Sequence, residues 1–146
     1  MFDLPTTRSF AEGCIARYGL AERIAFAAGD FDEDAVPDGF DAAWLSHVLH
    51  SESEAGCLKL LGKAAAAVQP GGLVLVQEFI LADAKDGPLF PALFSLNMLL
   101  RTDAGRAYSQ GELAAMMTEA GLAEVRRLKV ELPNGAGIMV GLKSES

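Results

Sequence analysis

Four residues with chemically useful side chains, Asp3, Asp30, His50 and Glu78, each stand where a strand-like run of this sequence ends. A histidine with an unperturbed pKa of ~6.5 takes up a proton near neutral pH. A carboxylate accepts hydrogen bonds from hydroxyl groups and from a histidine ring. Because ligands bind outside the carboxyl ends of the strands in open parallel sheets, we expect these four side chains along one edge of one sheet, where they form a candidate site.

Strand-like and helix-like segments alternate along most of the chain, without repeats or low-complexity tracts. This alternation predicts an α/β fold, in which helices cover a mainly parallel sheet with one antiparallel strand at its end. The turn sequence Pro133-Asn134-Gly135 predicts a closing antiparallel hairpin. The expected strands are residues 1–3, 23–28, 40–45, 72–76, 125–132 and 136–142, and the expected helices are residues 5–18, 51–68, 89–100 and 109–120.

Capping sequences indicate where two of these helices begin. Ser51 followed by Glu54, and Ser109 followed by Glu112, match the capping box. In that motif a serine hydroxyl and a glutamate carboxylate satisfy backbone N–H groups at the helix start. Gly121 is expected to end the last helix, because glycine readily adopts the left-handed conformation found there.

The composition is typical of one acidic globular domain. The 146 residues carry a formal net charge of −8, with 51% hydrophobic and 22% charged residues. A chain of this length forms one core, and its negative charge argues against a nucleic-acid surface, which needs clustered Lys and Arg. The longest mostly apolar stretch, residues 89–100, is shorter than the ~20 residues of a membrane span. The N-terminus lacks the basic segment of an export signal, so we expect a cytoplasmic protein.

The two cysteines, Cys14 and Cys57, show no metal-ligand spacing. We therefore expect no metal site and interpret both cysteines as buried, small apolar residues. Small-molecule chemistry remains the function class that the composition favours.

The order of several short motifs carries a family resemblance. "FDLP", "GDF", "FDAAWLSHVLHSESEAGCLKLL" and "QPGGLVLVQEFIL", closed by the terminal hairpin, resemble S-adenosylmethionine-dependent O-methyltransferases of the plant caffeate-type and bacterial antibiotic-pathway branch. The resemblance extends over residues 2–143 and implies a Rossmann-like class I methyltransferase sheet. It also implies that residues 1–146 form a single partial catalytic domain, its C-terminal part. The family's first strand, glycine-rich loop and N-terminal dimerisation region precede "FDLP" and are expected to be absent.

The resemblance assigns His50 as the general base and Glu78 as the glutamate that orients it. Removing the proton from a hydroxyl makes its oxygen a better nucleophile for methyl transfer, and a carboxylate on one ring nitrogen stabilises the imidazolium that forms. The plainer alternative is a surface histidine and a solvated glutamate. Glu78 argues against that alternative, because it interrupts an apolar strand where an unpaired charge is costly. Ala107 stands where classical members carry a second glutamate, and Ser51-Glu52 replaces their aspartate–tryptophan.

The same resemblance implies a binding site for S-adenosylmethionine and one for the acceptor. An aspartate that accepts from both hydroxyls suits the cofactor ribose, and an aromatic ring suits the face of its adenine. Turn aspartates and a core phenylalanine are the plainer alternatives, and residues 89–100 suit a core helix as well as a pocket wall. The implied cofactor contacts are Asp3, Asp30, Phe31 and Ser46, and the implied acceptor contacts are His47 and Met98.

The sequence thus predicts methyl transfer to a hydroxyl group of a small, aromatic or polyketide-like acceptor. C- or N-methylation is one alternative, and a non-catalytic or partner-dependent methyltransferase fragment is another. Without the family's first strands, the edges of residues 23–28 and 40–45 would expose unpaired backbone groups. We therefore expect either self-association into a homo-oligomer or rearrangement of the strands, and no methyltransferase activity from these 146 residues alone.

Overall fold

The computed structural model describes residues 1–145 and divides the chain into two units, Met1–Pro37 and a second that begins at Asp38. In the first unit, β1 (Phe2–Asp3) pairs with β2 (Ala27–Ala28) in a two-stranded parallel sheet. A single 3-10 turn, η1 (Pro5–Thr7), leads into α1 (Arg8–Arg17). Proline suits this helix start because its missing N–H would have no helical partner there.

The first unit differs from the sequence prediction in two ways. The expected strand at residues 23–28 is reduced to β2, because Arg23 and Ile24 donate their backbone N–H groups to the carbonyl of Leu20 and so form a turn. The helix expected at residues 5–18 is divided into η1 and α1, and within residues 1–145 Phe10 and Tyr18 are exposed while only Ala11 of α1 is buried.

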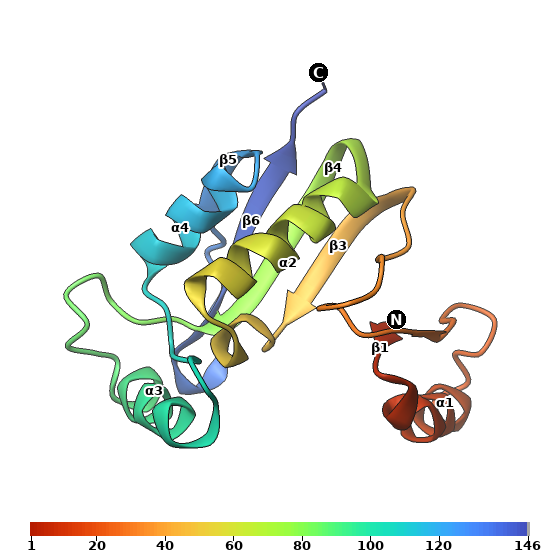
Figure 1. The fold of residues 1–146 in the computed structure, drawn as a ribbon, viewed down its shortest axis with the longest axis horizontal. Helices are drawn as coiled ribbons and strands as arrows, with labels where there is room; N and C mark the ends of the chain where they lie inside the picture. The colour runs from red at the N-terminus through yellow and green to blue at the C-terminus, as the bar shows by residue number, and fades with distance from the viewer. Residues whose placement is uncertain (146) are drawn as a thin grey trace. The chain divides into compact units, whose positions relative to one another are not determined.

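The second unit is built on a four-stranded sheet in the order β3-β4-β6-β5 (Figure 1). Strand β3 (Phe40–Ser46) runs parallel to β4 (Val68–Phe79). Strand β6 (Ala136–Lys143) is antiparallel to both of its neighbours, β4 and β5 (Leu122–Arg127). The α/β class and the antiparallel hairpin are confirmed.

The place of the antiparallel strand was wrong in the sequence prediction. Strand β6 lies between β4 and β5, not at the edge of the sheet. Six successive residues of β6, from Ala136 to Gly141, are buried, and burial on both faces is typical of an interior strand. Strand β5 begins at Leu122, directly after the left-handed Gly121, and ends at Arg127, so the expected strand at 125–132 is shifted along the chain.

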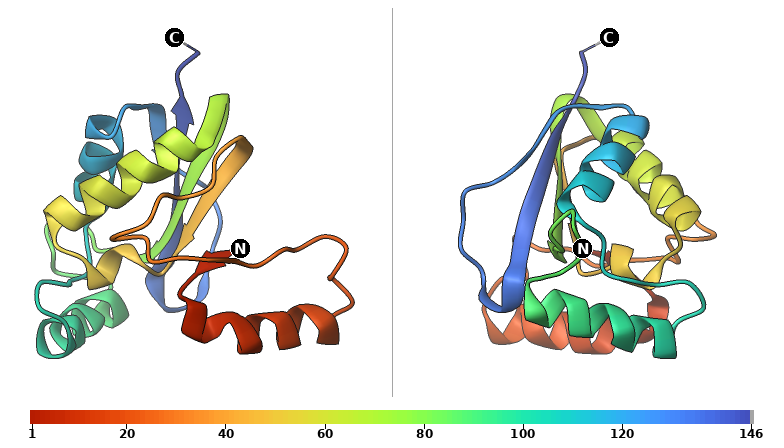
Figure 2. Two further views of the ribbon diagram at one scale, coloured as in Figure 1. Left: turned by 45° about the vertical axis from the view of Figure 1, so that its right-hand side comes forward. Right: turned by 90° about the vertical axis from the view of Figure 1, so that its left-hand side faces the viewer.

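Helices α2 (Glu54–Ala67) and α4 (Gln110–Glu119) lie side by side over one face of this sheet (Figures 1 and 2). The core between them and the strands is formed by fully buried apolar side chains. These include Cys57, Leu61, Val74, Val76, Leu113, Met117 and Met139. The third helix, α3 (Leu89–Arg101), contacts the end of β4 and the turns η2 (Leu49–Ser51) and η3 (Pro133–Gly135).

One of the two predicted capping boxes is confirmed. Ser109 and Glu112 each bond the other's backbone N–H at the start of α4. At α2 the prediction was wrong, because Ser53 caps the helix by accepting from the N–H of Gly56. Ser51 belongs instead to η2, where its hydroxyl donates to the carbonyl of Val48.

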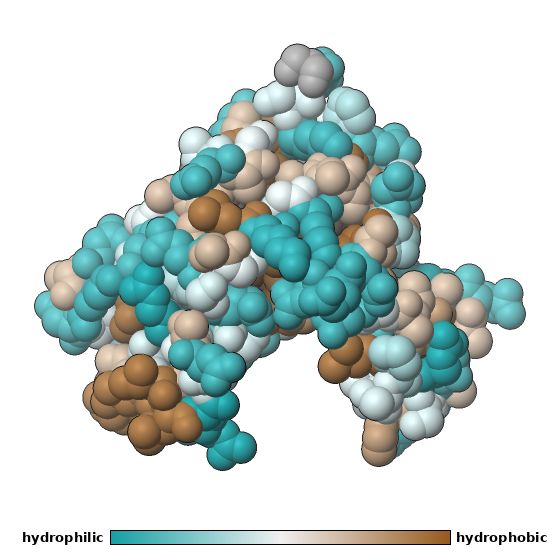
Figure 3. All heavy atoms as spheres, in the orientation of Figure 1, coloured by the Kyte–Doolittle hydropathy of each residue, from teal (hydrophilic) through white to brown (hydrophobic). Residues whose placement is uncertain are grey.

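Helix α3 is not a core helix within the described chain. Only Pro91 of its residues is buried, and its leucines form an apolar area that Figure 3 shows in brown at the lower left. No helix among residues 1–145 combines the length and the apolar composition needed to cross a membrane. The exposed leucines are Leu89, Leu93, Leu96, Leu99 and Leu100.

The two cysteines should differ sharply in reactivity. Cys57 is fully buried, its Sγ contacts the carbonyl of Leu49 at 3.3 Å, and burial raises the pKa of its thiol to about 11. Cys14 is exposed, which corrects the expectation that both are buried. Because only the thiolate is alkylated at a useful rate, iodoacetamide at mildly alkaline pH should modify Cys14 and leave Cys57 unmodified, as measured by intact mass.

The control is Cys14→Ser, which should take up no label when native and one label in denaturant. Modification of Cys57 in the native variant, at the rate seen in denaturant, would contradict this burial.

Candidate functional site

The ends of two parallel strands bring the predicted catalytic residues together. The last paired residues of β3 and β4 are Ser46, which stays exposed, and Gln77. His47 continues the ladder by donating its N–H to the Gln77 carbonyl at 2.9 Å, but its φ of 54° then turns the chain out of the sheet. The short turn Leu49–Ser51 follows. His50 is thereby placed over Glu78, the next residue of β4.

Glu78 is a buried carboxylate whose two oxygens are both used. Its side chain is 3% exposed. Oε1 accepts from the backbone N–H groups of Leu49 at 2.9 Å and of His50 at 3.4 Å, and Oε2 lies 2.8 Å from His50 Nδ1. Burial of a charge is tolerated only when it is paired and hydrogen-bonded. Glu78 therefore fixes both the backbone of the turn and the ring of His50.

The contact with Glu78 determines which nitrogen of His50 is available for chemistry. A neutral imidazole that donates Nδ1–H to a carboxylate has its lone pair on Nε2. Nε2 has no hydrogen-bond partner within residues 1–145, and the side chain is 16% exposed. The edge of the His50 ring meets Phe94 of α3 at a centroid distance of 4.8 Å. This arrangement can accept a proton from a substrate and stabilise the charge that results.

His47 shares the same carboxylate at a longer distance. Its Nδ1 lies 3.6 Å from Glu78 Oε2 and has no hydrogen-bond partner, while its Nε2 lies 3.2 Å from Gln77 Nε2. The ring packs on Phe79 at a centroid distance of 4.5 Å. Sequence reasoning missed the roles of Gln77 and Phe79. The alternation of side chains along β4 places Gln77 and Phe79 together on one face and Glu78 on the other, so it could have linked these two residues to each other but not to Glu78.

An aromatic cluster borders the two histidines. Phe79 contacts both Phe90 and Phe94 of α3, at centroid distances of 4.9 and 4.8 Å. Met98 is half-buried and follows Phe94 by one helical turn, so it lies on the same face of α3. The apolar helix predicted from the sequence thus borders the imidazoles through one face and leaves its leucines exposed.

The stretch that precedes α4 packs against the backbone of His50. A Cβ at Gly105 would collide with the His50 carbonyl oxygen, so only glycine allows this approach. Ala107, which stands where the resemblance expects a second glutamate, is buried and donates its N–H to Ser95 Oγ at 3.1 Å. Glu78 is therefore the carboxylate that contacts His50 within the described residues.

The predicted cofactor aspartates of the first unit each bond a backbone N–H close by in the sequence. Asp3 Oδ1 accepts from the N–H of Leu4 at 2.7 Å, and Asp30 Oδ1 accepts from the N–H of Asp32 at 2.9 Å. Each carboxylate keeps its Oδ2 without a hydrogen bond among residues 1–145, and Phe31 is half-buried. The expectation of one sheet was wrong, because Asp3 is the last residue of β1 and Asp30 comes shortly after β2, and these two strands form a separate two-stranded sheet.

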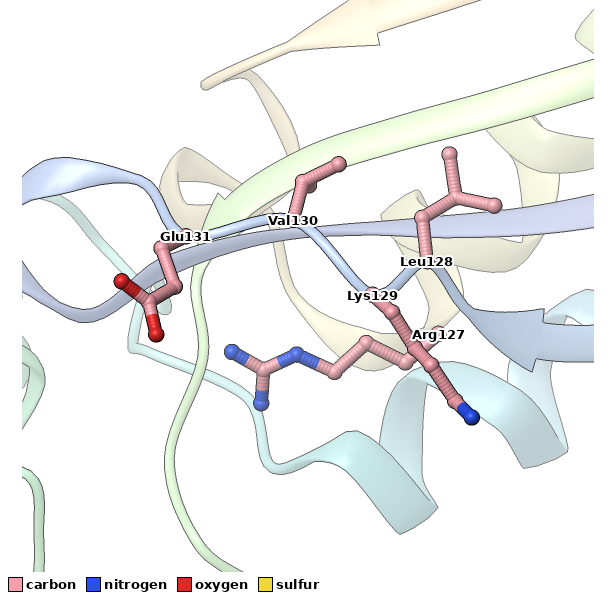
Figure 4. Close-up of a pocket in the computed structure, with 5 residues that line it drawn as sticks. All are labelled: Arg127, Leu128, Lys129, Val130 and Glu131. Atoms are coloured by element: carbon pink, nitrogen blue, oxygen red, sulfur yellow. The ribbon is translucent and has the colours of Figure 1, made fainter.

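A hollow elsewhere on the second unit lacks comparable chemistry. It is open to solvent and lined by consecutive residues after β5, and it contains no histidine (Figure 4). None of the predicted site residues borders it. The lining residues are Arg127, Leu128, Lys129, Val130 and Glu131.

Comparison with known proteins gives consistent matches. A model of the O-methyltransferase domain matches residues 1–123. The chain is 39% identical over 142 residues to 3-hydroxy-5-methyl-1-naphthoate 3-O-methyltransferase of Streptomyces sahachiroi, covering 97% of this chain and 41% of that protein. It is 42% identical over 126 residues to acetylserotonin O-methyltransferase of Bos taurus, covering 86% of this chain and 36% of that protein.

A solved structure agrees with these sequence matches. The structure of PigF with SAH, a protein of Serratia sp., aligns with a TM-score of 0.89 and 32% identity over 97% of this chain and 42% of that chain. The chain thus spans about two fifths of the length of the proteins it matches.

Replacement of the buried carboxylate should destabilise the fold. In Glu78→Gln, the amide keeps one accepting oxygen, so either the backbone N–H of Leu49 or the His50 ring loses its acceptor. We expect the free energy of unfolding in urea to fall by ~1–3 kcal/mol, the range for an unsatisfied buried group. The matched control is Glu131→Gln at an exposed position, which should stay within ~0.5 kcal/mol of the wild type. Equal losses in the two variants would contradict the role given to Glu78.

Proposed function

Because this chain belongs to the S-adenosylmethionine-dependent O-methyltransferase family, we propose that it serves methyl transfer to a hydroxyl group of a small acceptor, with His50 as the general base. The observation that carries this proposal is the 2.8 Å contact between His50 Nδ1 and Glu78 Oε2. That contact leaves His50 Nε2 as the proton acceptor and places a negative charge behind the ring.

The residues of the chain handle the proton and the geometry of the reaction. S-adenosylmethionine supplies a methyl group on a positively charged sulfur. His50 Nε2 would take the proton as the acceptor O–H bond breaks, and the cofactor would supply its methyl group to the oxygen and leave as a neutral thioether. Glu78 stabilises the resulting imidazolium, which then returns its proton to solvent.

The residues present fit the cofactor in chemical type. Asp3 and Asp30 each retain a free carboxylate oxygen for hydroxyl or amino donors, and the half-buried ring of Phe31 suits an adenine face. Ser46, exposed at the end of β3, offers a further hydroxyl. We assign these four residues to cofactor binding.

The acceptor is proposed to be aromatic or polyketide-like. Phe79, Phe94 and Met98 provide flat and adaptable apolar surface beside His50, and His47 adds a polar group. The Streptomyces relative is named for the methylation of a hydroxynaphthoate, an aromatic hydroxyl compound. A homo-oligomer remains our prediction, supported by the exposed leucines of α3 and by Trp44, which is exposed on the edge strand β3.

The general-base role can be tested by kinetics. In the full-length protein with a phenolic acceptor, His50→Ala should lower turnover by ~10²–10⁴, the usual contribution of general-base catalysis. The affinity for S-adenosylmethionine should change little, because the base contacts the acceptor. Glu78→Gln should lower turnover less, since the remaining amide oxygen can hold the ring in place while the compensating charge is lost.

Normal turnover of His50→Ala at neutral pH would remove the base from the mechanism. The products would then be analysed for C- or N-methylation, and proximity alone would account for the rate. A full-length wild-type protein that binds no S-adenosylmethionine would instead favour the non-catalytic or partner-dependent alternative.

The cofactor assignment predicts a binding defect. Asp30→Ala should weaken binding of S-adenosylmethionine by ~1–3 kcal/mol, as expected when a charged hydrogen-bond partner is lost. Calorimetric titration of the full-length protein measures this, with Asp38→Ala, at an exposed aspartate outside the predicted site, as the control. Unchanged affinity in Asp30→Ala would remove Asp30 from the site.

A further inference from the structure

The site contains a cluster of three potential metal ligands, His47, His50 and Glu78. Each offers one ligand atom, and the three atoms lie within 4.8 Å of one another. Glu78 Oε2 is 2.8 Å from His50 Nδ1 and 3.6 Å from His47 Nδ1. His47 Nδ1 is buried without a hydrogen-bond partner, so one nitrogen of the cluster faces the carboxylate with its bonding capacity unused.

The two separations that involve Glu78 Oε2 are close to those between the ligands of a small metal ion. Bonds of ~2.0–2.2 Å in tetrahedral geometry place the ligand atoms of zinc about 3.3 Å apart. The two distances to Glu78 Oε2, 2.8 and 3.6 Å, lie on either side of this value. Small side-chain movements would therefore let the ion bind in place of the proton between His50 Nδ1 and Glu78 Oε2.

The groups around the cluster would support the ligands. Glu78 Oε1 is already held by two backbone N–H groups, which leaves Oε2 for the ion. Gln77 lies 3.2 Å from His47 Nε2, and rotation of its amide by half a turn presents an oxygen to that nitrogen. A metal-bound histidine typically donates its other N–H to such an acceptor.

We propose that His47, His50 and Glu78 bind a divalent transition-metal ion, with Zn²⁺ as the best match, and that the bound ion switches off the base. Two imidazoles and one carboxylate, with the fourth position left for water, form a ligand set that zinc accepts. Mg²⁺ and Ca²⁺ prefer oxygen ligands only, so they should not compete.

The inhibitory effect follows from the tautomer of His50 and rests on the proposed function. When Nδ1 donates its lone pair to the ion, the ring proton moves to Nε2 by exchange with solvent. Nε2 then donates a hydrogen bond instead of accepting one, so it cannot take the acceptor's proton. The ion would thus bind His50 at Nδ1, on the side of Glu78, and change the protonation of Nε2 on the other side of the ring.

Zinc binding can be measured by competition with a chromophoric chelator. The full-length protein should carry Cys14→Ser, because the exposed thiol of Cys14 could bind zinc by itself. We expect one tight equivalent, not displaced by excess Mg²⁺, and at least tenfold weaker binding in His47→Asn. Asparagine suits the left-handed φ of residue 47 but is too short to reach the ion.

The matched control is Glu33→Gln, at an exposed position within the acidic stretch of the first unit, which should bind zinc like the parent protein. Equal affinity in His47→Asn and its parent would place the ion elsewhere and overturn the proposal.

The nitrogen spectrum of the His50 ring tests the switch directly. Without metal, the Glu78 contact predicts a proton on Nδ1; with saturating Zn²⁺ the proton should be on Nε2. A ring that keeps its Nδ1 proton at saturation would overturn the proposal whatever the affinity.

Kinetics separate this inference from the proposed function. Zn²⁺ should inhibit methyl transfer, and the inhibition constant in His47→Asn, measured against that variant's own zinc-free rate, should rise at least tenfold. Zinc bound at the cluster with unchanged turnover would refute His50 as the base and leave the metal site standing. Loss of turnover in His50→Ala without any zinc binding would refute the metal site and leave the base standing.

Discussion

The burial of the Glu78 carboxylate is the constraint on which the candidate site depends. A buried charge needs several hydrogen-bond donors, and the chain supplies them from the turn that follows the neighbouring strand. Two backbone N–H groups bond Oε1, and the His50 ring bonds Oε2. The same bonds that satisfy Glu78 therefore set the path of the turn and the tautomer of His50. Stability and chemistry are coupled in this contact, because neither can be altered alone.

The segment before α4 supports this arrangement through its backbone and small residues, without a charged contact to His50 among residues 1–145. Gly105 allows the chain to approach the His50 carbonyl, and the hydroxyl of Tyr108 donates to the carbonyl of Glu52 at 2.7 Å. Ala107 at the position of a second glutamate means that one carboxylate serves two imidazoles. A second carboxylate could hold His50 and leave Glu78 for His47. In its absence, the two rings depend on the same oxygen, Glu78 Oε2.

The parts of the fold that depend on local sequence could be predicted, and those that depend on distant contacts could not. Parallel strands end at one edge of a sheet, so the sequence was sufficient to place His50 near Glu78. The capping box at Ser109 is likewise a local signal. At α2, two serines compete for the cap, and the bond from Ser51 to the carbonyl of Val48 decides in favour of Ser53. The interior position of β6 follows from pairing between segments far apart in the chain, which periodicity does not specify.

His47 is the residue that extends the pair of His50 and Glu78 to the three ligands of the proposed metal site. Its backbone is held in the left-handed region by the bond to the Gln77 carbonyl, and its ring is held by Phe79 and the Gln77 amide. These contacts leave His47 Nδ1 facing Glu78 Oε2 at 3.6 Å, too long for a strong hydrogen bond. With the metal absent, His50 therefore has the closer contact with the carboxylate, and its Nε2 keeps the lone pair. An ion that draws both rings onto Oε2 would use the same residues and reverse the role of Nε2, so the proposed base and the proposed metal site depend on one arrangement of side chains.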